Sequence, residues 1–305
     1  MSLKIIFMGT PEFSIPSLKL LKESNHEVIC VYTQSPKKKS RGQKILKTPI
    51  HTFSEENNIK VRTNNLNEKN EFLQFKKFNP DLVIVVAYGQ MIPDQYLKIP
   101  NLLFLNVHAS LLPKWRGAAP IERAIINMDK ETGVSIMKIE KKLDAGPYIS
   151  QAKVKINEET TSGSLREELS KIGAKTLLEV IELIMSGKDK YTKQDDSKAT
   201  HAKKIDKSET KINWNENAKD IVAKINAFSP NPGAWFKMNN QRIKVIKAIE
   251  VSLSGKVGTI LDKSLVIAAK KNSVKILKLQ KEGKKIMNLN DFIVGNSVKI
   301  GTELN

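Results

Sequence analysis

Short apolar runs alternate with helical patterns over the first 185 residues of the chain. Strand-like runs occupy residues 4–8, 28–32, 60–62, 82–87, 102–108, 132–139 and 149–156. Apolar residues at helical spacing mark 16–21, 72–78, 119–127 and 164–185. Apolar strands that alternate with helices are typical of a sheet covered on both faces. The pattern therefore predicts an α/β fold with a doubly wound, mostly parallel sheet.

The pattern changes after residue 187. Residues 188–206 are polar and lysine-rich, which is typical of a linker. A helix near 218–228 follows, and then short strands near 234–237, 242–249, 257–261, 265–268 and 274–279, with Gly and Asn at the turns. Such spacing predicts a small β-barrel. We expect domains over 1–187 and 207–305, joined by a linker over 188–206.

Composition is that of an ordinary globular protein. The chain has 305 residues, of which 40% are hydrophobic and 27% charged. Its longest apolar run, residues 82–88, is too short to cross a bilayer, and the N-terminal apolar run is too short for a secretory signal. The single cysteine, Cys30, lies in an apolar run and fits the core of a protein from a reducing compartment. These features predict a cytoplasmic protein.

The charge is strongly positive, at +19. Basic proteins of this kind tend to bind nucleic acid or another polyanion. Because Lys supplies 45 of the 51 basic residues and Asn is abundant, part of this charge can also reflect genome composition. The net charge is +9 over the last 100 residues and +10 over the first 205, so the C-terminal part is the more basic.

The strongest sign of chemistry is a pair of polar residues at the end of a predicted strand. Asn106 and His108 end the apolar run 102–108, and residues two apart share one face of a strand. Ligands of open α/β sheets bind beyond such strand ends. An amide and an imidazole together can stabilise the oxyanion formed when a carbonyl is attacked, and His can also carry a proton.

One acidic residue, Asp144, completes a set that handles protons without a metal. It follows the predicted strand 132–139 in the turn 143–146, where it could orient His108, although Asp in such turns is more often a turn former. Ser110 lies outside any nucleophile-elbow motif. The four histidines are scattered and Cys30 stands alone, so no metal site is expected.

Two basic loops are candidates for contacts with a phosphate backbone. The first spans residues 35–42 after a predicted strand and carries Lys37, Lys38, Lys39 and Arg41. The second follows His108 and carries Lys114 and Arg116. Because both lie near the edge of the sheet where ligands bind, we interpret them as phosphate contacts, although a solvated charged face is the ordinary alternative.

Taken together, these motifs resemble the methionyl-tRNA formyltransferase family. The resemblance rests on N-V-H-A-S-L-L-P-K-W-R-G-A-A-P-I at 106–121, F-M-G-T-P-E-F-S at 7–14, V-V-A-Y-G at 85–89, L-D-A-G at 143–146, K-I-N-W at 211–214 and A-F-S-P-N-P at 227–232. It covers the chain nearly end to end. The chain departs from the family's usual pattern in the Lys run of its first basic loop and in Ala145-Gly146-Pro147 after Asp144.

The resemblance implies a formyltransferase catalytic domain followed by an OB-like C-terminal domain that binds tRNA. It implies transfer of a formyl group from the co-substrate 10-formyltetrahydrofolate to the α-amino group of methionine on initiator methionyl-tRNA. Asn106, His108 and Asp144 take the catalytic positions. The implied folate-binding residues are Ser110, Leu111, Leu112, Pro113, Val86, Tyr88 and Gly89. The first basic loop takes the position that meets the tRNA acceptor end, and we expect a monomer.

The sequence motifs are also compatible with two other functions. One is a formyltransferase for a small amine such as a nucleotide-sugar, which would need neither the basic loop nor the positive C-terminal part. The other is an RNA-binding protein without catalysis, which would need no Asn106, His108 and Asp144 set.

Overall fold

The computed structural model describes residues 2–39, 44–296 and 298–304, and its chain divides into two compact units. The first contains Met1–Gly117, Thr132–Val154 and Arg166–His201, and the second contains Ala118–Glu131, Lys155–Leu165 and Ala202–Asn305. The sequence prediction placed residues 118–131 and 155–165 in the N-terminal domain. Apolar spacing indicates that such segments are buried, but it does not show which part of the chain they pack against.

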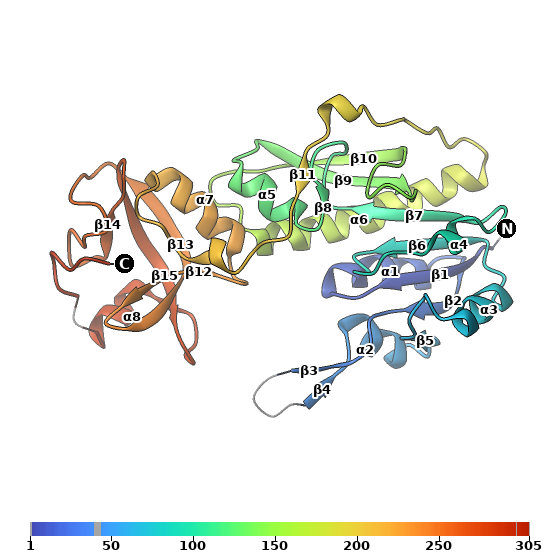
Figure 1. Ribbon diagram of the computed structural model, residues 1–305, viewed down its shortest axis with the longest axis horizontal. Helices are drawn as coiled ribbons and strands as arrows, with labels where there is room; N and C mark the ends of the chain where they lie inside the picture. Colours follow the sequence, from blue (N-terminus) through green and yellow to red (C-terminus); the bar gives the residue numbers. More distant parts are fainter. Residues whose placement is uncertain (1, 40–43, 297, 305) are drawn as a thin grey trace. The chain divides into compact units, whose positions relative to one another are not determined.

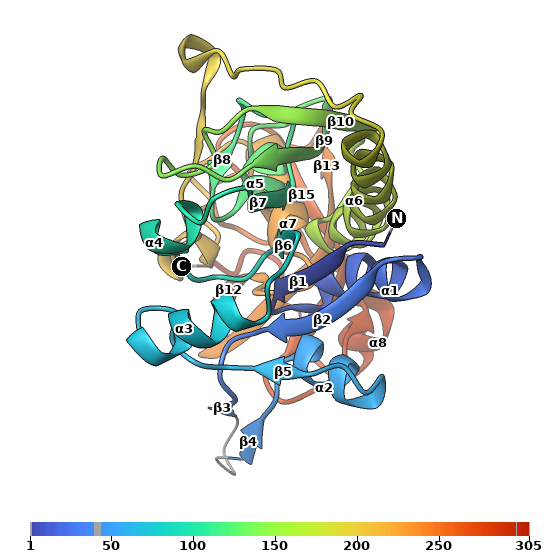
Figure 2. The ribbon, with the colours of Figure 1, turned by 90° about the vertical axis from the view of Figure 1, so that its right-hand side faces the viewer.

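A mixed sheet forms the centre of the first unit (Figures 1 and 2). Its strand order is β10-β9-β7-β6-β1-β2-β5. The pairs from β7 through β6, β1 and β2 to β5 are parallel, whereas β9 is antiparallel to β7. The strands are β1 Lys4–Gly9, β2 Glu27–Tyr32, β5 Val61–Arg62, β6 Leu82–Val86, β7 Leu103–His108, β9 Glu131–Lys138 and β10 Tyr148–Lys155. The prediction of a doubly wound, mostly parallel sheet is confirmed.

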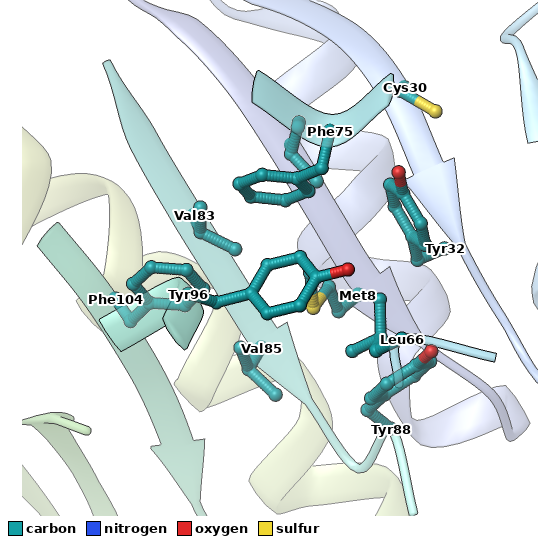
Figure 3. Close-up of a cluster of buried hydrophobic side chains, with 11 residues drawn as sticks. Met8, Cys30, Tyr32, Leu66, Phe75, Val83, Val85, Tyr88, Tyr96 and Phe104 are labelled. Carbon is teal, nitrogen blue, oxygen red and sulfur yellow. The ribbon is translucent and has the colours of Figure 1, made fainter. Parts of the chain in front are cut away.

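Helices cover both faces of this sheet, which is why its central strands β1 and β6 are buried almost throughout. Figure 2 shows α1 (Ile15–Glu23) and α6 (Ser162–Met185) on one side of the sheet and α3 (Lys69–Lys77) on the other. Phe75 of α3 packs with Val83, Val85 and Phe104 in the cluster drawn in Figure 3, whereas Val107 lies against Gly173 of α6. Because side chains alternate along β7, Asn106 and His108 share the face of Phe104.

Local signals explain the remaining helices of this unit. The helix α2 (Pro49–Glu56) has Pro at its start and the Thr48 hydroxyl as N-cap, accepting from the His51 N–H at 3.1 Å. The short helix α4 (Asp94–Leu97) and the 3₁₀ turns η1 (Glu12–Ser14) and η2 (Asp196–Lys198) complete the set. The prediction from apolar periodicity missed α2 and α4.

Two short strand pairs lie outside the main sheet. Strands β3 (Lys37–Lys39) and β4 (Lys44–Leu46) pair antiparallel, and β8 (Arg116–Gly117) pairs with β11 (His201–Ala202). The sequence predicts a plain loop over residues 35–42, and this is wrong for 37–39, which are strand. Lysines are poor strand formers, so the pairing rests on backbone hydrogen bonds that composition does not report.

The second unit is built around an antiparallel sheet. Its strands are β12 (Ala234–Met238), β13 (Gln241–Val251), β14 (Val266–Ala268), β15 (Ser273–Lys281) and β16 (Met287–Asn288). Helices α5 (Pro120–Ile126), α7 (Ala218–Phe228) and α8 (Leu289–Val294) and the 3₁₀ turn η3 (Ser208–Thr210) belong to the same unit. A separate, smaller β domain is therefore confirmed. The strand predicted at 257–261 is reduced to isolated bridges at Thr259 and Ile260.

Candidate active site

The end of β7 carries the predicted pair. Asn106 lies opposite Val85 of β6 in the parallel ladder and opposite Met137 of β9 in the antiparallel one, and His108 lies opposite Ser135. Beyond Val86, the chain that follows β6 therefore emerges beside Asn106 and His108 at one edge of the sheet. This is the edge at which open α/β sheets bind ligands.

The His108 ring is buried and fixed by one hydrogen bond. Its Nε2 lies 2.9 Å from the carbonyl oxygen of Trp115, and the residue is 5% exposed. Since a carbonyl oxygen only accepts, Nε2 carries a proton and donates it to Trp115. The other nitrogen, Nδ1, lies 3.7 Å from Oδ2 of Asp144. That distance is too long for a hydrogen bond but short enough for a carboxylate to stabilise an imidazolium.

The Asp144 carboxylate is held by a backbone amide. Its Oδ2 accepts from the N–H of Gly117 at 2.9 Å, and the residue has a φ of 49°, in the left-handed region. Two residues on, a Cβ at Gly146 would lie 2.0 Å from the Lys138 carbonyl oxygen, so only glycine fits. The sequence expected Asp144 to orient His108. In the structure the hydrogen bond of the His108 ring goes to the Trp115 carbonyl, and Asp144 Oδ2 lies 3.7 Å from the other ring nitrogen.

The Asn106 side chain differs from those of His108 and Asp144, which both have polar partners in the site. The Asn106 side chain is half-buried and makes no hydrogen bond within the described part of the chain. An amide has two donor hydrogens, and in Asn106 both stay available at the sheet edge. The site thus combines a free donor, a basic ring nitrogen and a carboxylate.

The loop after His108 is tied down by its own polar groups. The Ser110 hydroxyl is buried and donates to the Lys114 carbonyl at 2.5 Å. Ser135 Oγ donates to the Ser110 carbonyl at 2.6 Å and accepts from the Leu112 N–H at 3.0 Å. Leu112 is buried, whereas Leu111 and Pro113 are half-buried.

The segment after β6 is fixed through its carbonyls. The Val86 carbonyl accepts from Ser14 Oγ at 2.6 Å, and the Tyr88 carbonyl accepts from Thr10 Oγ1 at 2.8 Å. Gly89 has a φ of 78°, and a Cβ there would lie 2.5 Å from Gln34 Nε2. The Tyr88 ring lies in the buried cluster of Figure 3, where burial raises the pKa of its hydroxyl to about 12. Its phenol is therefore neutral and faces the core.

Two of the lysines predicted to bind phosphate are exposed to solvent. Lys114 and Lys37 are exposed, with Lys37 Nζ donating to Gln34 Oε1 at 2.9 Å. Lys38 and Lys39 lie in β3 beside Lys37, and Arg41 lies outside the described residues.

Arg116 corrects the prediction, because it is only 2% exposed. Its guanidinium donates to Gln194 Oε1 at 2.9 and 2.8 Å and pairs with Asp196 at 2.8 Å. A buried, paired guanidinium is not free to bind a phosphate.

Sequence reasoning missed Gln194 and Thr200, which contact the site from the segment predicted as linker. Gln194 is buried and Thr200 accepts at its Oγ1 from the Trp115 N–H at 2.9 Å. Neither residue carried a signal, since the surrounding stretch is uniformly polar. Cys30 matches expectation as a core residue, with burial raising the pKa of its thiol to about 12.

The fold and the family models that match this chain define a formyl transferase. Residues 3–181 match the formyl transferase family, and residues 204–297 match the C-terminal domain of that family. A methionyl-tRNA formyltransferase of Pelagibacter ubique is 45% identical over 100% of this chain and 99% of its own length, and one of Paramagnetospirillum magneticum is 40% identical over 99% and 100%. The chain belongs to the methionyl-tRNA formyltransferase family.

A solved structure shows the same fold at lower identity. An N-formyltransferase from Helicobacter canadensis, in complex with folinic acid and dTDP-3-aminofucose, has a TM-score of 0.67 and 20% identity, covering 92% of this chain and 99% of its own. At this identity the likeness concerns the fold.

Two further kinds of site are absent from the described residues. They contain no group of three or more His, Cys, Asp or Glu side chains arranged to hold a metal ion. In the same residues no helix has both the length and the apolar character needed to cross a membrane.

Proposed function

We propose that this protein transfers a formyl group from 10-formyltetrahydrofolate to the α-amino group of methionine on initiator methionyl-tRNA. The observation that carries the proposal is the group at the end of β7: a free Asn106 amide, a His108 ring with its Nδ1 available, and the Asp144 carboxylate 3.7 Å from that nitrogen. The full-length similarity to methionyl-tRNA formyltransferases supports the same reaction.

Asn106 is the oxyanion donor in this mechanism. When bound, the folate supplies the formyl group and takes up a proton at N10 as the group leaves. Attack by the amine places negative charge on the formyl oxygen, and the Asn106 amide donates to it. One such donor contributes about 3–4 kcal/mol to transition-state stabilisation. Because Nε2 of His108 already donates to Trp115, the neutral ring has no second N–H for this oxygen.

His108 carries the proton instead. Its Nδ1 accepts the proton that the attacking amine loses and returns it to the leaving nitrogen, so no net proton is gained or lost. Asp144 stabilises the imidazolium that exists between these two events. The Trp115 carbonyl keeps the ring in one orientation throughout.

We expect the co-substrate to bind beside this group. Ser110, Leu111, Leu112 and Pro113 on one side and Val86, Tyr88 and Gly89 on the other follow two neighbouring parallel strands. The Val86 and Tyr88 carbonyls are already bonded, so we expect folate to be contacted through backbone N–H groups and apolar side chains there. This is compatible with a flat, polar-edged ring system entering at the sheet edge.

For tRNA, we propose that the hairpin lysines Lys37, Lys38 and Lys39, with Arg41 and Lys114, contact phosphates, and that Arg116 does not. The C-terminal domain, for which we keep the boundary at 207 after a linker over 188–206, lies within the last 100 residues, whose net charge is +9. We further propose a cytoplasmic monomer, as a translation enzyme acting on free aminoacyl-tRNA requires no membrane.

The test is formyl transfer by the purified protein from 10-formyltetrahydrofolate to charged initiator tRNA. Charged elongator tRNA and a nucleotide-sugar amine serve as competing acceptors. We expect initiator tRNA to have the highest kcat/KM by at least about 100-fold, which is about 2.7 kcal/mol. Preference for the sugar amine would make the protein a small-amine formyltransferase, and tRNA binding without transfer would make it an RNA-binding protein.

A further inference from the structure

Both titratable groups of the candidate site are attached to one short stretch of backbone, residues 115–117. His108 donates to the Trp115 carbonyl at 2.9 Å, and the Gly117 N–H donates to Asp144 Oδ2 at 2.9 Å. The relative position of the imidazole and the carboxylate therefore depends on this backbone. Whatever holds these three residues also sets the 3.7 Å separation of Nδ1 and Oδ2.

This stretch has an unusual conformation. Trp115 has a φ of 60° and Gly117 a φ of 125°, and Asp144 itself has a φ of 49°. Left-handed conformations of residues other than glycine are costly and persist where surrounding contacts enforce them. The necessary contacts come from the segment that follows residue 190. Thr200 accepts from the Trp115 N–H at its Oγ1 and from the Arg116 N–H at its carbonyl, both at 2.9 Å.

Gln194 joins the two halves of the site from the same segment. Its Oε1 accepts two hydrogen bonds from the Arg116 guanidinium, at 2.9 and 2.8 Å. Its Nε2 donates to the carbonyls of Asp144 at 2.9 Å and Gly146 at 2.6 Å. A side-chain amide has two donor hydrogens and one acceptor oxygen, and Gln194 uses all of them while 6% exposed.

These contacts form a closed ring. The Asp144 carboxylate accepts from the Gly117 N–H, and the backbone leads from Gly117 to Arg116. The Arg116 guanidinium donates to Gln194, and the Gln194 amide donates back to the Asp144 carbonyl. Asp144 is thus held at both its side chain and its backbone. Arg116 is held in turn by Asp196 at 2.8 Å.

We propose that Gln194 is a positioning residue for the transfer reaction, which sets the Asp144 carboxylate against His108 without touching substrate. The proposal rests on the proposed function for its kinetic part. It gives the polar segment 188–206 a part in catalysis through the turn 144–146. Misplacement of a catalytic group by about 1 Å costs up to about 100-fold in rate.

Two matched substitutions separate the halves of the Gln194 contact. Gln194→Glu keeps an oxygen for Arg116 but places an acceptor against the Asp144 and Gly146 carbonyls. Gln194→Met has similar volume and removes both sets of hydrogen bonds. We expect both variants to lose about 10- to 100-fold in kcat, with the KM for tRNA and for folate within about threefold of wild type.

A double-mutant cycle shows whether the effect passes through Asp144. In an Asp144→Asn background, Gln194→Met should lower kcat by less than about threefold further, because the group that it positions is already lost. An independent structural measurement is the hydrogen exchange of the Gly117 amide by NMR, which should become faster in both Gln194 variants and in Asp144→Asn. This measurement needs no substrate.

The outcomes separate the two proposals. If Gln194→Glu has wild-type kcat, or if Gln194→Met and Asp144→Asn lower kcat independently, Gln194 acts as an ordinary structural residue through Arg116 and the inference is wrong. Unchanged Gly117 exchange in both Gln194 variants would also overturn it. If the wild-type protein fails to formylate methionyl-tRNA, the proposed function fails, while Gly117 exchange still decides the positioning. Should Gln194→Met not fold, Gln194→Glu alone decides through kcat and exchange.

Discussion

Removing the Asn106 amide should slow catalysis strongly while leaving the protein almost as stable as before. The amide has no hydrogen bond within the described residues and is half-buried, so Asn106→Ala breaks no side-chain hydrogen bond among them. We expect the free energy of unfolding to change by less than about 1 kcal/mol, as for other substitutions without a buried partner.

The expected loss in rate follows from the role of the amide. The Asn106 amide is the free donor of the site, because the N–H at His108 Nε2 already donates a hydrogen bond to the Trp115 carbonyl. Loss of one preorganised oxyanion donor typically costs about 2.7–4 kcal/mol, or about 100- to 1,000-fold in kcat. The KM for tRNA should change by less than about threefold, because the donor acts mainly on charge that develops in the transition state.

Single-turnover formylation of charged initiator tRNA, with enzyme and folate in excess, measures the chemical step directly. Asn106→Asp is the matched control, because it keeps the shape of the side chain but offers no N–H donor at neutral pH. We expect it to be at least as slow as Asn106→Ala. A single-turnover rate within about threefold of wild type in either variant would refute the assignment of Asn106 as oxyanion donor.

Three further predictions concern the rest of the molecule. His108→Gln can still donate to the Trp115 carbonyl but has no basic nitrogen, so it should fold normally and lose about 100- to 10,000-fold in kcat, and a loss below tenfold would exclude His108 as the proton carrier. Replacing Lys37–Lys39 by Gln should reduce the slope of log Kd against log salt for tRNA by up to about 2.7, and an unchanged slope would mean that these lysines are only solvated. Glu71 is buried beside Arg62 and Tyr32; burial alone would raise the pKa of its carboxyl, but their hydrogen bonds outweigh it and lower that pKa. The contribution of ionised Glu71 to stability is therefore present above the unfolded-state pKa of about 4.3 and is lost as the pH falls below it. In urea unfolding, Glu71→Ala should lower the free energy of unfolding by about 3–5 kcal/mol at pH 7 and by less at pH 3. An equal cost at both pH values would contradict this.

The position of Asn106 and His108 at a strand end could be predicted from the periodicity of the sequence alone. The alternation of apolar strands and helices, and the polar residues at the end of 102–108, are local features of the sequence. Because parallel strands share one sheet edge, that pattern was sufficient to bring Asn106 and His108 next to the segment after β6. The short hairpin of β3 and β4 could not be found in this way, since its pairing depends on backbone hydrogen bonds between lysine-rich strands.

The roles of charged residues could not be read from the sequence. Arg116 and Lys114 stand two residues apart in the same basic loop, yet one is buried and the other exposed. The difference arises because Gln194, 78 residues further along the chain, accepts from the Arg116 guanidinium. A polar side chain can be buried only where such partners satisfy it, and those partners are fixed by tertiary structure.

The sequence by itself determined the fold class, the family and the identity of the three candidate catalytic residues, because those depend on local pattern and on short motifs. Only the tertiary structure decided which contacts their side chains make. It directs the Nε2–H of His108 to the Trp115 carbonyl, leaves the Asn106 amide without a hydrogen bond among the described residues, and places Gln194 of the polar segment against the Asp144 turn. These are contacts between distant segments, set by chain packing rather than by the order of neighbouring residues.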